Sequence, residues 1–437
     1  MSSSTGVSSG QPDGSPTEET WAVIAGGGTA GHVLPGLAVA DELVARGHPV
    51  SSLHFVGAER GIESRLVPEA GYAITLLPGR GIERRLSLQN VAASFGLLAA
   101  LWKAVVLMRR RRPAVVLALG GFASAACSLA ALLWRVPLVV ADQNARAGAA
   151  NRLVGRFAAA CAVPFEETDL PHAVVTGNPV RPEILAVAVA RRDPAQRAAA
   201  RSAARVHLGL PLERTVVVLF AGSLGSRRLN TAMYGAALQW ADRDDLAIYH
   251  VVGSRDWDDR PAFARAERAE LGGAAGPEAT GERASGDSAA AERASDERLE
   301  EGHDGLWYRA IRYEDRMDLV MAAADLAVCR SGGTTVAELA AVGLASVLVP
   351  LPIATRDHQR ANAAALVAVG GAVLVSDDEL DERRLVHEVE SIIGSGGSGG
   401  SGGDVLWTMG EAARSVGRLD SATAVADLIE AHARRPR

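Results

Sequence analysis

The sequence predicts two doubly wound α/β domains, each built on a parallel sheet. Short apolar runs alternate with helix-length segments rich in Ala, Leu and Arg. The pattern starts again at Thr215–Ala221 (TVVVLFA), a continuous apolar run typical of a strand buried on both faces. The chain of 437 residues, with 48% hydrophobic and 22% charged residues, is long enough for two globular domains. Its net charge of −6 argues against nucleic-acid binding.

The first domain is expected over residues 20–180 and the second over 212–390. Residues 1–19 have no apolar core and no early basic cluster, so we expect a disordered tail and no signal peptide. Strands of the first domain are expected at Trp21–Ala25, Leu53–Val56, Val115–Leu119, Leu138–Ala141 and Val174–Thr176. Those of the second are expected at Thr215–Ala221, Ala247–Val252, Leu326–Cys329, Ser346–Val349 and Val373–Val375.

Four segments lie outside these strands. Arg181–Leu210 is Ala/Arg-rich and is predicted to be helical. Residues 256–304 are charged and small, which predicts a mobile surface insertion, and 394–403 (GSGGSGGSGG) predicts a flexible linker. Residues 405–437 are expected to form a helix that packs back across the domains.

The three cysteines, Cys127, Cys161 and Cys329, lie far apart in the chain. This spacing favours buried small apolar residues over a disulfide framework or a zinc site. A reducing cytoplasm is therefore the expected compartment, and no metal site is predicted.

The block Ala25–His32 (AGGGTAGH) follows the first strand and opens a helix. It formally contains the G-x-G-x-x-G pattern of dinucleotide sites, but the matching acidic residue after the second strand comes too late for a nicotinamide cofactor. Glycines let a backbone approach a ligand, and a helix start disfavours the protonated form of a histidine. His32 is therefore the candidate general base; the alternative is a histidine that only caps or packs.

Three further turns in the second domain have the same strand–turn–helix form. Ser223 lies in AGSLGS, suited to phosphate. Glu338 lies one turn inside the helix that follows CRSGG, where a carboxylate can accept two hydrogen bonds from a ribose diol. His358, Gln359 and Asn362 follow another strand and offer neutral partners for sugar hydroxyls. Each has a plain alternative: an ordinary tight turn, a solvated glutamate or a helix cap.

Together these blocks resemble one family closely, the MurG family, which moves N-acetylglucosamine from UDP-N-acetylglucosamine to undecaprenyl-diphospho-N-acetylmuramoyl-pentapeptide (lipid I) to make lipid II. The resemblance covers residues 21–380. It implies a GT-B fold, in which two Rossmann-like domains face each other across a cleft. The blocks are GGGTAGHVLPGLAVA, DQNARAGAANR, TGNPVR, AGSLGSRRLN, CRSGGTTVAELAAVG and DHQRANA.

The resemblance implies an inverting hexosyltransferase of peptidoglycan and cell-wall synthesis, a pathway on which cell shape and division depend. It implies His32 as the catalytic base, the diphosphate and sugar near Ser223, Arg330 and Gly333, and the ribose on Glu338. The residues expected to bind UDP-N-acetylglucosamine are Thr29, Ala30, Gly31, His32, Asn144, Arg181, Ser223, Arg330, Gly333, Glu338, His358, Gln359 and Asn362. Those expected on the acceptor side are Gly28, Thr29 and Ser124.

No cofactor is implied. The expected partners are UDP-N-acetylglucosamine, lipid I, the cytoplasmic face of the cell membrane, where the enzyme would be peripheral, and other proteins of cell-wall synthesis. Residues 91–108 are apolar and precede Arg109–Arg112. They are expected to form a helix packed on the sheet, and an interfacial role of its exposed edge, with Arg84, Arg85 and Arg109–Arg112 on anionic lipid, is the added hypothesis.

Two blocks depart from the family. Gly120–Ala126 reads GGFASAA where the family has GGY-x-S-x-P, so the tyrosine hydroxyl and the proline are missing. Ala141–Asn144 reads ADQN where the family has His-Glu-Gln-Asn. The first departure favours the alternative function, a related GT-B transferase that uses a UDP-sugar and a different acceptor.

Overall fold

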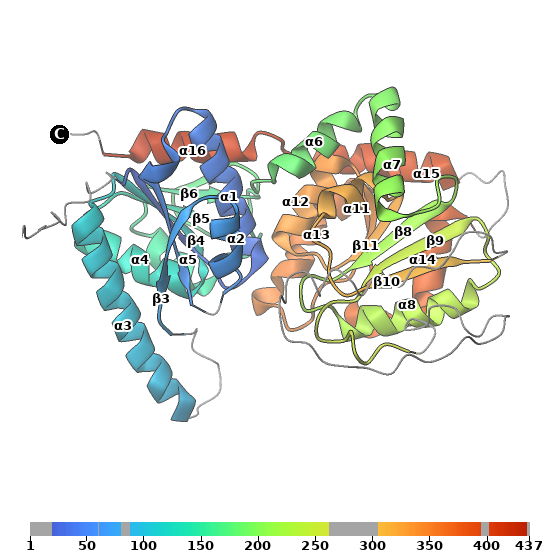
Figure 1. Ribbon diagram of the computed structural model, residues 1–437, viewed down its shortest axis with the longest axis horizontal. Helices are drawn as coiled ribbons and strands as arrows, with labels where there is room; N and C mark the ends of the chain where they lie inside the picture. The colour runs from blue at the N-terminus through green and yellow to red at the C-terminus, as the bar shows by residue number, and fades with distance from the viewer. Residues whose placement is uncertain (1–19, 60, 80–87, 262–304, 395–401, 435–437) are drawn as a thin grey trace, which may run out of the picture.

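In the computed structural model, which describes residues 20–59, 61–79, 88–261, 305–394 and 402–434, the chain forms two α/β domains side by side (Figure 1). The first holds a seven-stranded sheet in the order β3-β2-β1-β4-β5-β6-β7, in which every pairing is parallel. Its strands are β1 (Ala22–Gly26), β2 (Leu53–Ala58), β3 (Ala73–Leu77), β4 (Val115–Gly120), β5 (Leu138–Ala141), β6 (Ala160–Val163) and β7 (Ala173–Val175).

The second domain holds a six-stranded sheet in the order β10-β9-β8-β11-β12-β13, again parallel throughout. The two predicted parallel sheets are therefore confirmed. β9 and β11 are buried along their whole length, as apolar strands covered on both faces must be. Its strands are β8 (Thr215–Phe220), β9 (Leu246–Val251), β10 (Trp307–Ile311), β11 (Leu326–Cys329), β12 (Ala345–Leu348) and β13 (Ala372–Leu374).

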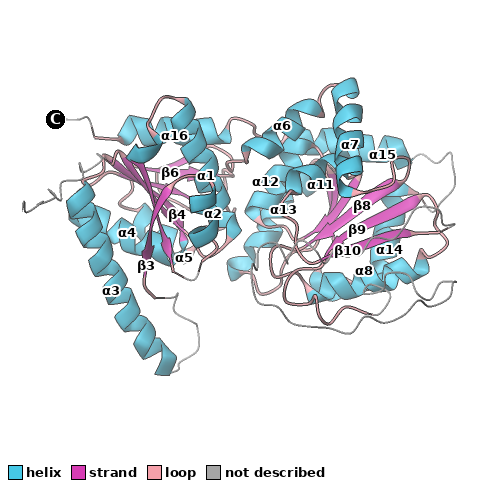
Figure 2. Cartoon of the chain, viewed as in Figure 1, coloured by secondary structure: helices cyan, strands magenta, loops and turns pink. Residues whose placement is uncertain are grey.

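Helices cover the sheets of both domains (Figure 2). Those of the first half of the chain are α1 (Ala30–Ala45), α2 (Glu63–Glu69), α3 (Leu88–Arg111), α4 (Gly121–Leu133) and α5 (Ala149–Gly155), with the 3₁₀ turn η1 (Val50–Ser52). The described helices that follow β7 are α6 (Pro182–Ala190), α7 (Pro194–Leu208), α8 (Arg227–Gln239), α11 (Met317–Ala323), α12 (Gly333–Val342), α13 (His358–Ala368), α14 (Glu382–Ile393), α15 (Gly402–Ser415) and α16 (Ser421–His432), with η2 (Thr355–Asp357) and η3 (Asp377–Glu379). None of the described helices is both long and apolar enough to cross a membrane.

Each predicted strand is present within one or two residues, but β3, β6 and β10 were not predicted. β6 is four residues with the sequence ACAV, too short and too small in its side chains to stand out as an apolar run. β3 is an edge strand that begins on an exposed residue. Edge strands can carry weaker apolar patterns because only one neighbour and part of a face need covering.

Two segments predicted to be helical each form two helices. Arg181–Leu210 forms α6 and α7, because Asp193 caps the second helix by accepting from the Gln196 N–H and Pro194 occupies its first position. The helix expected at the C-terminus forms α15 and α16. α15 packs on the second domain, whereas α16 crosses back to α1 and to the first sheet, and Figure 1 shows both at the end of the colour range.

The predicted tail, most of the predicted insertion and most of the predicted linker (1–19, 262–304 and 395–401) lie outside the described residues. The first residues of the expected insertion are described, and for them the prediction is wrong. Trp257 is buried in the core of the second domain, and the Arg260 guanidinium lies 3.7 Å from its ring centroid. An indole supplies enough apolar surface to anchor this loop despite its charged neighbours.

Candidate active site at the domain interface

The glycines after β1 pack mainly against the domain's own side chains. A Cβ on Gly26 would lie 2.7 Å from the Cβ of Leu119, and one on Gly27 would lie 2.0 Å from Oε1 of Glu63. Only Gly28, with φ +93°, faces open space. The left-handed backbone therefore accounts for glycine at Gly28, whereas internal packing requires the absence of a side chain at the other two.

His32 lies in the first turn of α1, next to the exposed Thr29. Its Nδ1 is 3.2 Å from the Thr29 hydroxyl, and its Nε2 faces Gly120, where a Cβ would come within 3.2 Å of it. Burial lowers the pKa of His32 below its usual value, although nearby Asp142 and Glu63 act in the opposite direction. The lowered pKa favours the neutral imidazole, which can accept a proton at a ring nitrogen.

Asp142 organises the loop after β5. Its Oδ1 accepts from the Asn144 N–H at 3.0 Å, and its Oδ2 accepts from the Gly148 N–H and from Nδ2 of Asn151, both at 2.9 Å. All these bonds are local, so the aspartate shapes the loop and the shorter acid at this position is structurally accommodated. The loop leaves Asn144 directed at the second domain.

Asn362 of α13 joins the two domains. It is completely buried, and its Oδ1 accepts from the Ala145 N–H at 2.8 Å while its Nδ2 donates to Oδ1 of Asn144 and to the Ser331 carbonyl, both at 3.1 Å. Asn144 and Asn362, both expected to bind the donor sugar, are thus bonded to each other.

Glu338, predicted to bind ribose, is bonded to another predicted site residue. Nε and Nη2 of Arg181 both lie 2.9 Å from Oε1 of Glu338, whose side chain is only 7% exposed. Burial raises the pKa of Glu338, and Arg181 opposes that rise. Arg181 is the N-cap of α6, whose apolar residues pack in the core of the second domain. The ion pair with Glu338 therefore holds the start of α6 against α12.

The start of α12 contacts the first domain. The Thr334 hydroxyl donates to the Gly31 carbonyl at 3.3 Å. A Cβ on Gly333 would lie 1.8 Å from the Gln143 carbonyl oxygen, so only glycine fits there. The helix N-terminus with its positive potential therefore lies against the loop that carries His32.

Arg330 is engaged within its own domain. Its guanidinium donates to the carbonyls of Val349 and Pro350 and to Oγ of Ser226, and Nη1 lies 2.6 Å from Oδ1 of Asp377. These bonds hold together the ends of β8, β11 and β12. A direct contact with a diphosphate requires that some of them be exchanged.

The other expected donor residues differ in exposure. Ser223 is exposed in a turn with Gly222 (φ +78°) and accepts from Ser254 through its carbonyl. Gln359 uses Oε1 to accept from the Leu351 N–H at 2.9 Å, and Nδ1 of His358 bonds the Thr355 carbonyl at 2.9 Å. These bonds use Oε1 of Gln359 and Nδ1 of His358 and do not involve Nε2 of either residue.

Two ion pairs that the sequence did not indicate span the interface. Nη1 of Arg356 lies 2.8 Å from Oδ2 of Asp169, and Nη2 of Arg65 lies 3.8 Å from Oδ1 of Asp315. Arg356 also has the left-handed value φ +60°, a strained conformation for a side chain with Cβ. The only local feature that singles out Arg356 is this backbone strain, which cannot be seen in the sequence.

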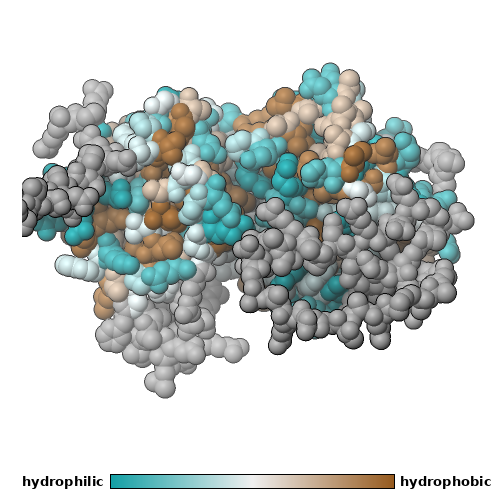
Figure 3. All heavy atoms as spheres, viewed as in Figure 1, coloured by the Kyte–Doolittle hydropathy of each residue, from teal (hydrophilic) through white to brown (hydrophobic). Residues whose placement is uncertain are grey.

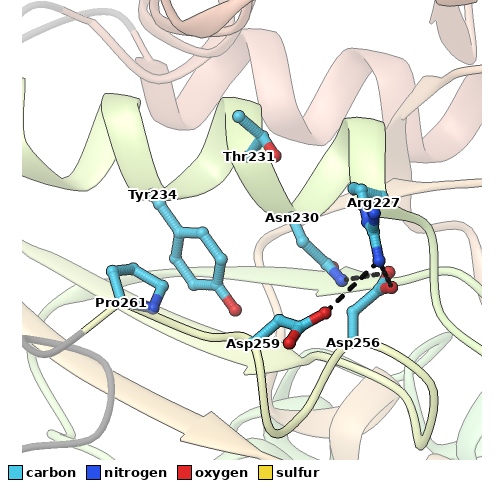
Figure 4. A pocket seen from close by; sticks show the side chains of 7 residues that line it. All are labelled: Arg227, Asn230, Thr231, Tyr234, Asp256, Asp259 and Pro261. Carbon is cyan, nitrogen blue, oxygen red and sulfur yellow. Dashed lines mark hydrogen bonds and ion pairs between the residues drawn. The ribbon is translucent and has the colours of Figure 1, made fainter.

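A hollow of about 380 Å³ lies apart from this interface, beside α8 (Figure 4). Within it Arg227 pairs with Asp259 and with the buried Asp256, and Asn230 donates to Asp256. None of the predicted site residues lines it. The residues that do are Arg227, Asn230, Thr231, Tyr234, Asp256, Asp259 and Pro261.

Comparison with known proteins matches both halves of the chain to one family of transferases. Residues 22–163 match the glycosyltransferase family 28 N-terminal domain and 283–396 match the C-terminal domain. The UDP-N-acetylglucosamine–N-acetylmuramyl-(pentapeptide) pyrophosphoryl-undecaprenol N-acetylglucosamine transferase of Desulforudis audaxviator is 35% identical over 93% of this chain and 97% of its own length. The enzyme of the same name from Nocardia farcinica is 35% identical over 92% and 93%. The chain belongs to the MurG family.

Solved structures agree with that assignment. Acinetobacter baumannii MurG superposes with a TM-score of 0.62 at 25% identity, covering 94% of this chain and 99% of that one. A UDP-GlcNAc 2-epimerase from Neisseria meningitidis bound to UDP-GlcNAc gives a TM-score of 0.57 at 13% identity over 94% and 99%, which shows a shared fold alone. The predicted GT-B fold is confirmed.

The block in which this MurG-family chain departs from its relatives is built around two glycines. Gly120 and Gly121 have φ +104° and +85°, and a Cβ on Gly121 would lie 2.6 Å from the Gly27 carbonyl oxygen. Phe122 is half-buried, and Ser124, expected on the acceptor side, is 1% exposed within α4. The structure therefore places Gly120, rather than Ser124, beside His32, and Gly121 against Gly27.

Proposed function

We propose that this chain transfers N-acetylglucosamine from UDP-N-acetylglucosamine to the 4-hydroxyl of the muramoyl residue of lipid I, making lipid II with inversion at the anomeric carbon. The observation that carries the residue assignment is the Thr334–Gly31 contact. It sets the N-terminus of α12, which also bears Glu338, against the loop that bears His32. Donor and acceptor groups would thus meet at one interface.

In this proposal His32 takes the proton of the acceptor hydroxyl, whose oxygen then attacks the anomeric carbon as the bond to UDP breaks. The electron pair of that bond leaves with the diphosphate. The backbone N–H groups at the start of α12 stabilise the developing negative charge, and Ser223 can add a hydroxyl donor. Glu338 accepts from a ribose hydroxyl through Oε2, the carboxylate oxygen to which Arg181 is not bonded.

The assay that tests this is transfer of labelled sugar from UDP-N-acetylglucosamine to a lipid I analogue. His32→Ala should lower kcat by about 10²- to 10⁴-fold while donor binding persists. His207→Ala, an exposed histidine of α7, is the control and should retain full activity. Near-normal turnover by His32→Ala would show that the imidazole is not the base.

A different acceptor is the second candidate, and the Gly120–Ala126 block favours it. Phe122 offers no hydroxyl where the family has tyrosine, and Ser124 is buried. Phe122→Tyr should raise activity with the lipid I analogue if that acceptor is correct. If the wild-type protein transfers the donor sugar to other alcohols but not to the lipid I analogue, the second candidate is correct.

The proposed acceptor is a lipid, and the first domain offers a surface suited to a membrane. α3 projects beyond the body of this domain (Figure 1). Ala104 and Met108 of α3 are buried against the sheet, whereas Leu98 and Trp102 are 63% and 69% exposed. Leu133 of the adjoining α4 is 66% exposed. In the view of Figure 3, hydrophobic (brown) residues lie among hydrophilic ones on both domains.

We infer that this surface, with exposed Arg109 and Arg110, binds the cytoplasmic face of the membrane and leaves the protein peripheral. Arg111 is less available because it donates to the Thr20 hydroxyl. Arg84 and Arg85, also expected to contact lipid, lie outside the described residues. Partner proteins of cell-wall synthesis remain an expectation from the family.

A further inference from the structure

A buried carboxylate lies beneath the glycine loop that leads to His32. Glu63, the first residue of α2, is 1% exposed. Its Oε2 accepts from the Gly28 N–H at 2.9 Å and its Oε1 accepts from the Ala58 N–H at 2.7 Å. Because both oxygens accept N–H donors, the group is bonded as an ionised carboxylate is.

Three glycines make room for this carboxylate. A Cβ on Gly27 would lie 2.0 Å from Oε1 of Glu63, one on Gly61 would lie 2.0 Å from Oε2, and one on Gly57 would lie 2.3 Å from Cγ. Gly27 and Gly57 have no left-handed backbone that would call for glycine. The space taken by Glu63 is thus the physical reason for glycine at both positions.

The same carboxylate acts on His32. Burial lowers the pKa of His32, and Asp142 of the loop after β5 and Glu63 of α2 both raise it, whereas His358 at the start of α13 lowers it further. These are the titratable groups that face the imidazole from the elements packed around it. Glu63 alone among them also bonds the loop on which His32 depends.

We propose that Glu63 is a positioning residue for sugar transfer: it holds the turn at Gly27 and Gly28 that presents His32 to the interface, and its charge stabilises the imidazolium. The proton moves from the acceptor hydroxyl to His32, and Glu63 takes no part in that transfer. The proposal rests on the proposed function, because it assigns Glu63 to the step in which His32 acts as base.

Glu63→Gln tests the charge, because glutamine keeps the shape and one acceptor oxygen. The histidine titration followed by NMR should show a pKa of His32 lower than in the wild type, because the charge of Glu63 raises it. In the lipid I assay kcat should fall about ten- to a hundredfold, with its acidic limb moved to lower pH and the KM for the donor little changed. Glu69→Gln, an exposed glutamate of the same helix, should change neither.

An unchanged pKa of His32 in Glu63→Gln would overturn the electrostatic role. The NMR titration needs no substrate, so it tests the electrostatic role independently of the activity assay. Failure of the wild-type protein to transfer sugar to lipid I would instead overturn the proposed function.

A double-mutant cycle tests the steric part. Gly27→Ala should lower kcat strongly in the wild-type background, because its methyl group collides with the carboxylate. In a Glu63→Ala background the carboxylate that the methyl group meets is gone, so the substitution should cost little more. Equal losses in both backgrounds would mean that Gly27 serves a purpose other than seating Glu63.

Discussion

Arg181 holds Glu338 through a single carboxylate oxygen: Nε and Nη2 of the guanidinium both lie 2.9 Å from Oε1, and the two side chains are 19% and 7% exposed. Removing either partner from such a pair leaves a buried charge without compensation. The proposed ribose contact of Glu338 therefore depends on Arg181, which holds its carboxylate in place.

The donor KM should rise on acidification. Burial raises the pKa of Glu338, so its carboxyl becomes neutral at a pH where free glutamate is still ionised, and it then loses both Arg181 and the ribose hydroxyls. Glu338→Gln should have a high donor KM that no longer varies over this range. Steady-state kinetics from pH 5 to 8 measure this, and Glu213→Gln, an exposed control, should follow the wild type.

Asn362→Ala should weaken both the fold and the domain contact. The change leaves the Ala145 N–H without its buried acceptor, which costs about 2 kcal/mol in unfolding free energy. Chemical denaturation measures the loss, and small-angle scattering should show the two domains further apart. Unchanged stability would mean that water replaces the amide without cost.

Arg356 allows strain and interdomain pairing to be separated. Arg356→Ala removes the ion pair to Asp169 but keeps a Cβ at φ +60°, whereas Arg356→Gly removes both. The glycine variant should therefore unfold with a free energy about 1 kcal/mol higher than the alanine variant. Both should show equally weakened domain closure in scattering, and a closure that differs between them would contradict a role for the ion pair.

Membrane binding should depend on the surface of α3 and α4. Trp102→Glu and Leu133→Glu should reduce co-sedimentation with anionic vesicles about tenfold or more, because each places a charge on the apolar contact. Trp407→Glu, an exposed tryptophan on the second domain, is the matched control and should bind as the wild type does. Equal loss in all three variants would point to general damage rather than to this surface.

Much of the fold follows from local pattern. Continuous apolar runs such as TVVVLF mark strands buried on both faces, and the glycine turns that follow them mark helix starts, so the two sheets were predictable. The short β6 and the edge strand β3 were not, because few large apolar side chains are needed where a strand is short or has one neighbour. The break between α6 and α7 could have been predicted, because Asp193 followed by Pro194 is a typical N-cap and first helical residue.

The sequence alone determined which residue types stand at the ends of the strands, and through the motifs it determined the family and its chemistry. Only the tertiary structure decided which of them touch: Asn362 with Ala145 across 217 positions, Arg356 with Asp169, and Glu63 beneath Gly27. The physical reason is range. Turn and burial preferences act over a few residues and can be recognised in the sequence. These pairs, in contrast, form only after the sheets have assembled and their loops have packed.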